Sequence, residues 1–144
     1  MINFPDLNHP ILGLLKYNDT CDWYEGKLFF QDRSIEFSVS TDDETNVESI
    51  LEQIDGFVDR LEYYSETAKD YAVEQLLELK NDTWLDEDEK TLTPMQFKVR
   101  MLIKSIGISP DSSTCFYYDD GELFFGHEIS VTMDSSNRFI DAGI

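Results

Sequence analysis

The chain has 144 residues, of which 41% are hydrophobic and 13% aromatic, and this size and composition predict one folded domain, 1–144, around a single core. Thirty acidic residues against 11 basic ones give a net charge of −19. Such a charge argues against direct binding to nucleic acid or to an anionic membrane, because both require an excess of lysine and arginine.

The sequence shows no signal for a membrane or for secretion and only two cysteines. No apolar run has the length of a membrane-spanning helix, and the start of the chain lacks the basic and apolar regions of a secretion signal. Cys21 and Cys115 are too few for a disulfide framework and lie in no metal-binding pattern. We expect a cytoplasmic protein with reduced thiols and no cofactor.

The first distinctive segment is residues 20–30, which are rich in aromatic residues and contain Glu25-Gly26. Residues 114–125 repeat the same order of residue types around Asp119-Asp120-Gly121, with one additional acidic residue. Acidic-glycine pairs favour tight turns between strands. The similarity therefore predicts two equivalent hairpins flanking the centre of the chain, produced either by duplication or by chance convergence.

The central segment has the spacing of a helix. From Val47 the apolar residues recur at intervals of three and four up to Leu79, and Thr45-Asn-Val-Glu48 has the pattern of a capping box. One helix over 46–80 would be about 50 Å long, too long for a domain of this size. We therefore expect a break around 64–67, where Ser65 interrupts the apolar stripe, with Gly56 as a weaker candidate.

The helical segment is expected to end at Asn81-Asp82, and an acidic loop around Trp84 follows to Lys90. Thr93-Pro94 then predicts a capped helical turn over 94–98. Residues 99–108 are compatible with a strand or a helix, although their β-branched residues and the turn cluster at 109–113 favour a strand. With the hairpin that follows, they form a three-stranded meander. The predicted class is α+β, with one broken helix or two helices packed on antiparallel strands from both flanks.

The charge is concentrated in the predicted helices. Residues 41–90 hold 17 acidic and 4 basic residues, net −13. Acidic residues recur there at steps of three or four, which places them on one helix face. We call this set the acidic stripe: Glu48, Glu52, Asp55, Asp59, Glu62, Glu66, Asp70, Glu74 and Glu78.

Two interpretations of the acidic stripe remain open. It is either a solvated helix face or an electrostatic surface for a basic protein partner. In the second case neighbouring aromatic residues would anchor the interface. The candidate anchors are Trp23, Tyr24, Tyr63, Tyr64 and Trp84. The leading hypothesis is a non-catalytic protein-interaction module, such as an immunity-type inhibitor of a basic toxin; a DNA-mimic protein is an alternative.

A different hypothesis concerns chemistry near the second hairpin. His127 follows Asp119, Asp120 and Glu122, and carboxylates with an imidazole can bind a metal ion or act as an acid/base pair. Acidic residues at a hairpin tip are usually solvated, and a histidine is more often structural. The run Asp86-Glu-Asp-Glu89 lacks the spacing of a calcium loop and is expected to be solvated. An enzyme centred on His127 is therefore the second alternative.

Several motifs resemble one known family. They are Leu12-Gly-x-Leu, Trp23-Tyr-Glu-Gly, Leu79-x-Asn81-x-x-Trp84 and Tyr117-Tyr-Asp-Asp-Gly-Glu-Leu-Phe-Phe-Gly-His127-x-Ile129. Together they resemble the bacterial family called domain of unknown function 2262, from Leu12 to the end of the chain, with Phe125 where the family often has tryptophan. The resemblance implies a bacterial cytosolic protein and no established activity.

Overall fold

The computed structural model describes residues 4–42 and 46–144, whose strands form one eight-stranded sheet. The strands follow one another across the sheet in chain order. They are β1 (Leu7–His9), β2 (Gly13–Asn18), β3 (Trp23–Phe30), β4 (Arg33–Ser40), β5 (Leu102–Ile108), β6 (Thr114–Asp119), β7 (Ile129–Met133) and β8 (Phe139–Gly143).

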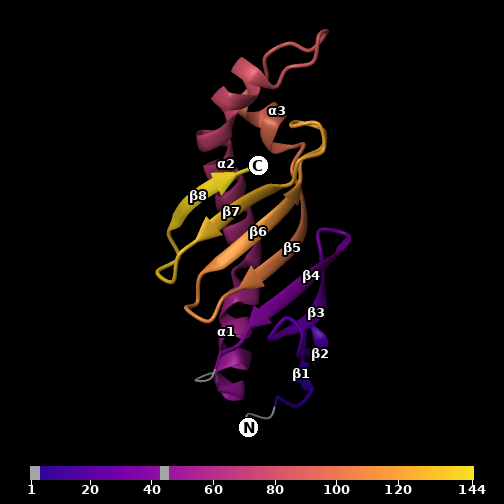
Figure 1. Ribbon diagram of the computed structural model, residues 1–144, viewed down its shortest axis with the longest axis vertical. Helices are drawn as coiled ribbons and strands as arrows, with labels where there is room; N and C mark the ends of the chain where they lie inside the picture. The colour runs from indigo at the N-terminus through magenta and orange to yellow at the C-terminus, as the bar shows by residue number, and fades with distance from the viewer. Residues whose placement is uncertain (1–3, 43–45) are drawn as a thin grey trace.

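All neighbouring strands are antiparallel except β4 and β5, which are parallel. Parallel neighbours need a crossover connection, and here the crossover contains the helices α1 (Val47–Asp59), α2 (Leu61–Thr83) and α3 (Pro94–Lys98). Figure 1 shows α1 and α2 behind the sheet, so that one sheet face is covered and the opposite face is open. The α+β class and the meander of β5, β6 and β7 are confirmed; β8 was not predicted.

The two segments with similar sequences do not form equivalent hairpins, so this prediction is wrong. Glu25-Gly26 lies inside β3 and pairs with Ser38 and Phe37 of β4. Gly26 permits close packing there, because a Cβ atom would lie 2.5 Å from the side chain of Leu15 on β2, which would have to shift. By contrast, the segment after β6 leaves the sheet and returns only at Ile129. The pair Glu25-Gly26 resembles a turn sequence, but its glycine serves close packing between strands.

The helix boundaries also differ from those predicted. The side chain of Asn46 caps α1 by accepting a 2.8 Å hydrogen bond from the Glu48 amide, whereas Thr45 lies outside the described residues. The break falls at Arg60 rather than at 64–67, and α2 continues to Thr83. Ser65 interrupts the apolar stripe for another reason, because it is buried and its hydroxyl meets that of Tyr118 at 3.2 Å.

The prediction at Thr93 is confirmed. Its side chain accepts a hydrogen bond from the amide of Gln96, whose side chain in turn accepts one from the Thr93 amide, and Pro94 begins α3. This reciprocal capping satisfies amides that have no partner within the helix.

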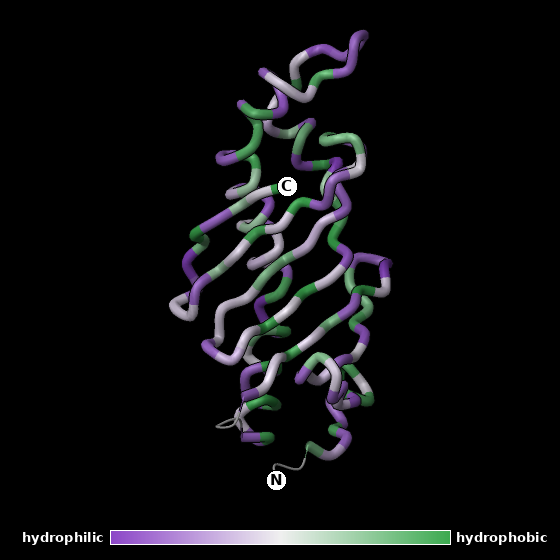
Figure 2. The backbone as a smooth tube through the Cα atoms, in the orientation of Figure 1, coloured by the Kyte–Doolittle hydropathy of each residue, from purple (hydrophilic) through white to green (hydrophobic). Residues whose placement is uncertain are grey.

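The core lies between the covered sheet face and the two long helices. The ring of Phe57 on α1 is 5.9 Å from those of Phe37 and Phe116 on the sheet and 5.5 Å from that of Tyr64 on α2. Figure 2 shows hydrophobic and hydrophilic residues interchanging along the strands, as expected when one face is buried. Within the described residues, no helix is both long and apolar enough to cross a bilayer.

Candidate functional sites

The acidic stripe lies on the outer side of α1 and α2. All nine side chains are exposed except that of Glu66, which is half-buried. The residues between them in sequence, such as Ile54, Leu61 and Ala68, point into the core. The amphipathic pattern therefore fixes the outward direction of the carboxylates, although the break at Arg60 divides them between two helices.

One residue of the acidic stripe is paired with a buried histidine. His9 is 5% exposed, and its Nδ1 accepts hydrogen bonds from the amides of Ile11 and Leu12 at 3.1 and 3.2 Å. The proton of the neutral ring is then on Nε2, which donates to the Asp55 carboxylate at 2.5 Å. His9 thus joins the turn after β1 to α1, a structural role that its sequence context did not indicate.

Two further residues of the acidic stripe share one lysine. Lys98 of α3 lies 2.7 Å from Asp70 and 2.8 Å from Glu66 of α2. The hydrogen bond to Asp70, followed by that to Glu66, raises the pKa of the Lys98 ammonium. The remaining six carboxylates form no ion pair with any described residue. We call this set the unpaired acids: Glu48, Glu52, Asp59, Glu62, Glu74 and Glu78.

The candidate aromatic anchors have very different environments. Tyr63 on α2 is 67% exposed and follows Glu62 directly. Trp23 and Trp84 are half-buried. Tyr24 is fully buried and its hydroxyl donates to the Pro5 carbonyl at 2.7 Å, so it belongs to the core and not to a surface. Tyr64 is likewise buried, whereas the exposed Tyr63 directly follows Glu62 of the acidic stripe.

Two of the three predicted carboxylates near His127, those of Asp119 and Asp120, accept hydrogen bonds from the backbone of their own loop, whereas Glu122 is exposed. Asp120 is 2% exposed, and its oxygens accept hydrogen bonds from the amides of Glu122, Phe124 and Gly126 at 2.8–3.0 Å. Asp119 accepts one from Gly121 in the same way, at 2.9 Å. These bonds shape the loop from β6 to β7 and leave the acids turned toward it.

His127 itself is exposed and packs edge-on against Trp84, with the ring centres 5.4 Å apart. Among residues 4–42 and 46–144, no three histidine, cysteine or acidic side chains are grouped so that they could hold a metal ion. His127 therefore stands with an aromatic cluster instead of with Asp119 and Asp120. Cys21 and Cys115 are both free thiols, one exposed and one half-buried.

The acidic loop after α2 is not simply solvated. Lys80 is fully buried, and its ammonium donates to the Trp84 carbonyl at 2.7 Å and to Glu89 at 2.6 Å. The hydrogen bond from Lys80 is the main reason that the pKa of Glu89 falls to about 2. Arg100 binds the second oxygen of Glu89 at 3.1 Å and donates twice to the Gly121 carbonyl. The sequence did not predict the pairing of Lys80 with Glu89, because a lysine in a helix is normally expected on the exposed face.

The open face of the sheet carries a hollow that the sequence did not predict. Its volume is about 700 Å³, and it extends over β2 to β6. The central strands β4 and β5 place small residues there, including Ser38, Ser105 and Gly107, while their alternate residues face the core. The sequence signal for this face was the alternation of serine or glutamate with β-branched or aromatic residues in 34–40.

Larger side chains border this hollow on both sides. Trp23 of β3 lies on one side and Tyr117 of β6 on the other. The Trp23 indole donates to Glu25 at 2.7 Å, and this bond, with one from Asn18, lowers the pKa of the Glu25 carboxyl. Partial burial, and then the neighbouring Cys115 thiol, raise the pKa of the Tyr117 hydroxyl. The sheet thus presents a polar depression between two aromatic residues.

Comparison with known proteins identifies a family and nothing more specific. Residues 9–144 match the family model described as an uncharacterised protein conserved in bacteria, domain of unknown function 2262. The chain belongs to this family, as its motifs indicated. No curated protein and no solved structure matches it.

Proposed function

We propose that this member of the family is a non-catalytic, cytoplasmic protein-interaction module that binds a basic protein through the outer side of α1 and α2. The observation that supports the proposal is the set of unpaired acids, which are exposed on consecutive helices and form no ion pair within the described part of the chain. Like charges at these spacings repel, at about 0.2–0.5 kcal/mol per pair. A cationic partner would relieve this repulsion.

Tyr63 extends this surface with an aromatic side chain. It is 67% exposed and directly follows Glu62 in the first turn of α2, and tyrosine is among the residues that contribute most to protein interfaces. In this arrangement the acids accelerate association and Tyr63 provides contact area. An immunity-type inhibitor of a basic toxin is the specific form of the proposal that fits this chemistry.

The same surface fits a DNA-mimic protein less well than it fits a protein that binds a basic partner. Mimicry of a phosphate backbone needs an uninterrupted series of negative charges, whereas Lys98 neutralises the acidic stripe at Glu66 and Asp70 in the middle of α2. A compact basic surface on a protein partner tolerates such an interruption.

The test compares two variants of equal net charge. In the first, Glu48, Glu52, Asp59 and Glu62 become Gln or Asn; in the second, the exposed Asp19, Asp32, Glu87 and Asp88 do. Both are used, with the wild type, to capture basic proteins from extracts of the source cell at low and at high salt. The proposal requires a basic protein that the wild type and the second variant retain at low salt and the first variant loses.

Retention of the same proteins by both variants would show that only the total charge matters. Tyr63→Ala adds a second readout, because an aromatic anchor should affect dissociation and change the salt dependence little. Recovery of no basic protein at low salt would contradict the proposal.

A further inference from the structure

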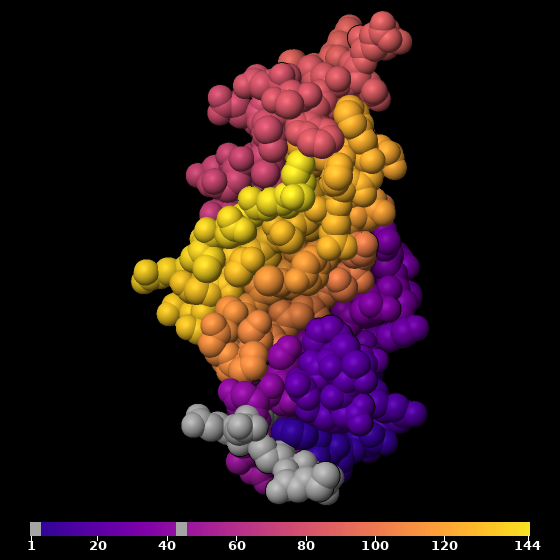
Figure 3. All heavy atoms as spheres, in the orientation of Figure 1, coloured from indigo at the N-terminus to yellow at the C-terminus, as the bar shows by residue number. Residues whose placement is uncertain are grey.

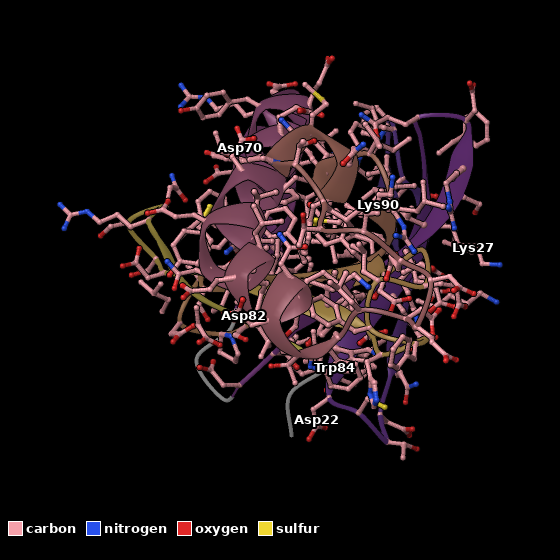
Figure 4. The ribbon with its side chains drawn as sticks, turned by 90° about the horizontal axis from the view of Figure 1, so that it is seen from above. Asp22, Lys27, Asp70, Asp82, Trp84 and Lys90 are labelled. Carbon is pink, nitrogen blue, oxygen red and sulfur yellow. The ribbon has the colours of Figure 1, made fainter. Side chains whose placement is uncertain are left out.

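The hollow on the open sheet face differs chemically from the rest of the molecule. Its border contains Lys16 opposite Glu25 and Lys27 opposite Glu36, each pair being direct neighbours on adjacent strands. Glu128 at the far side forms a 2.7 Å ion pair with Lys104. The local charges therefore balance on a protein whose net charge is −19. Figure 4 shows Lys27 pointing outward on a side of the molecule away from Asp70 of the acidic stripe.

The floor of the hollow offers hydroxyl groups without internal partners. The side chains of Ser38, Ser40 and Ser105 form no hydrogen bond with other described residues, and Glu36 forms neither a hydrogen bond nor an ion pair there. Strand register brings them together, since Glu36 is the neighbour of Ser105 and Ser38 that of Gly107. These groups can donate to and accept from a ligand without breaking an existing bond.

The depth of the hollow depends on one glycine. A Cβ atom on Gly107 would lie 3.2 Å from the Ser38 hydroxyl, so any larger residue would begin to fill the floor. Figure 3 shows the open side of the sheet. In the sheet order, β4 and β5 lie between β3, which carries Trp23, and β6, which carries Tyr117. The result is a small-residue floor between aromatic rims.

We propose that this hollow binds a neutral, polyhydroxylated ligand, a short saccharide. Aromatic rings at the border suit the apolar C–H faces of sugar rings, and serine hydroxyls and a Glu36 carboxylate that form no hydrogen bonds with other described residues suit their hydroxyl groups. The balanced charges favour a neutral ligand over a strongly cationic or anionic one. The volume of about 700 Å³ falls within the range of small-molecule sites, roughly 300–1,000 Å³.

Trp23 provides a reporter for the test. In a Trp84→Phe variant it is the only tryptophan, so its fluorescence can be titrated with neutral trisaccharides of glucose, galactose, mannose and N-acetylglucosamine. We expect the fluorescence to change and saturate with at least one of these saccharides. The titration extends to about 20 mM, so that dissociation constants above about 1 mM are also detected. Calorimetry on the wild type, which retains Trp84, gives an independent measurement.

Variants at the hollow separate this site from other surfaces. Trp23→Ala, Glu36→Gln and Gly107→Val should each weaken saccharide binding at least about tenfold. Phe29→Ala is the matched control, because Phe29 is a 73% exposed aromatic residue on the same face of β3 but outside the lining of the hollow. Thermal melting of each variant verifies folding.

Alkylation of Cys115 gives a readout that does not depend on tryptophan. This thiol lines the hollow, and a Cys21→Ser variant removes the second free thiol. A bound saccharide should slow its reaction with iodoacetamide severalfold. Absence of binding by every saccharide, equal binding by the Trp23→Ala variant, or preference for spermidine or inorganic phosphate as probes would overturn the proposal. None of these results depends on the unpaired acids.

Discussion

The ammonium of Lys80 lies 2.6 Å from the carboxylate of Glu89, although the lysine side chain is fully buried at the end of α2. A buried charge is unfavourable unless it is paired and hydrogen-bonded, and Lys80 obtains both from the loop that follows its helix. Arg100 binds the same carboxylate at 3.1 Å. One glutamate therefore holds the acidic loop against the body of the protein.

Replacing Glu89 with Gln should be strongly destabilising. The variant would leave the buried Lys80 ammonium with neutral acceptors alone, the Trp84 carbonyl and the amide oxygen of the new side chain, and with no negative charge from residue 89. We expect the free energy of unfolding to fall by about 3 kcal/mol. Urea denaturation measures this change. The double variant Lys80→Met, Glu89→Gln should lose less, because it removes the buried charge as well; a double variant that is less stable than Glu89→Gln would contradict this explanation.

Acid should weaken the same contact. The pKa of Glu89 is lowered from 4.5 to about 2 in the folded protein, mainly by the hydrogen bond from Lys80. A lowered pKa contributes stability that is complete above the unfolded value and is lost as the pH falls through the folded value. The stability difference between wild type and Glu89→Gln should therefore shrink between about pH 4.5 and pH 2. A constant difference in urea midpoints across this range would disprove the assignment.

Asp120 should be far more important for stability than its neighbour Asp119. Asp120 is buried and accepts hydrogen bonds from three backbone amides, whereas Asp119 is exposed and accepts one such bond. Asp120→Ala is expected to cost about 2–4 kcal/mol and Asp119→Ala about 1 kcal/mol or less. Chemical denaturation gives both values, and Trp84 fluorescence should reveal the altered loop in the first variant, since Trp84 contacts Phe124. Similar losses in both would show that the carboxylate of Asp120 does not organise the loop.

Two glycines should respond in opposite directions to alanine. Gly121 has a φ of +55°, and a Cβ atom there would lie 2.3 Å from the Arg100 carbonyl oxygen, so Gly121→Ala should destabilise the protein by more than about 1 kcal/mol. Gly56 lies inside α1 with no atom near its Cβ position, and Gly56→Ala should stabilise by about 0.5–1 kcal/mol. Thermal melting distinguishes them; a stable Gly121→Ala variant would show that the loop can move away from Arg100.

Local patterns predicted those elements whose determinants are close in sequence. The cap at Thr93, the first turn of α3 and a strand within 99–108 follow from neighbouring residues, and each is present, although the strand begins only at Leu102. The break at Arg60 could not be predicted in this way. The buried positions of α1 and α2, among them Ile54, Phe57, Leu61 and Tyr64, keep the helical spacing through the break, so the apolar pattern gives no sign of it.

The candidate sites are likewise divided between features that the local sequence predicts and features that only the tertiary structure decides. The sequence by itself determined the concentration of acids on an outward helix face, because amphipathic spacing directs those side chains away from the core. It could not determine which acids are already paired: Asp55 meets His9 across 46 residues, and Glu66 and Asp70 meet Lys98 only when α3 packs on α2.

The open-face hollow depends even more on tertiary structure. Its floor forms because β4 and β5 pair in parallel across a crossover of three helices, which places Ser38 beside Gly107. Each strand carries the alternation of small and large residues in its own sequence. Only the register between strands decides which small residues become neighbours, and register is fixed by packing of the opposite face against the core.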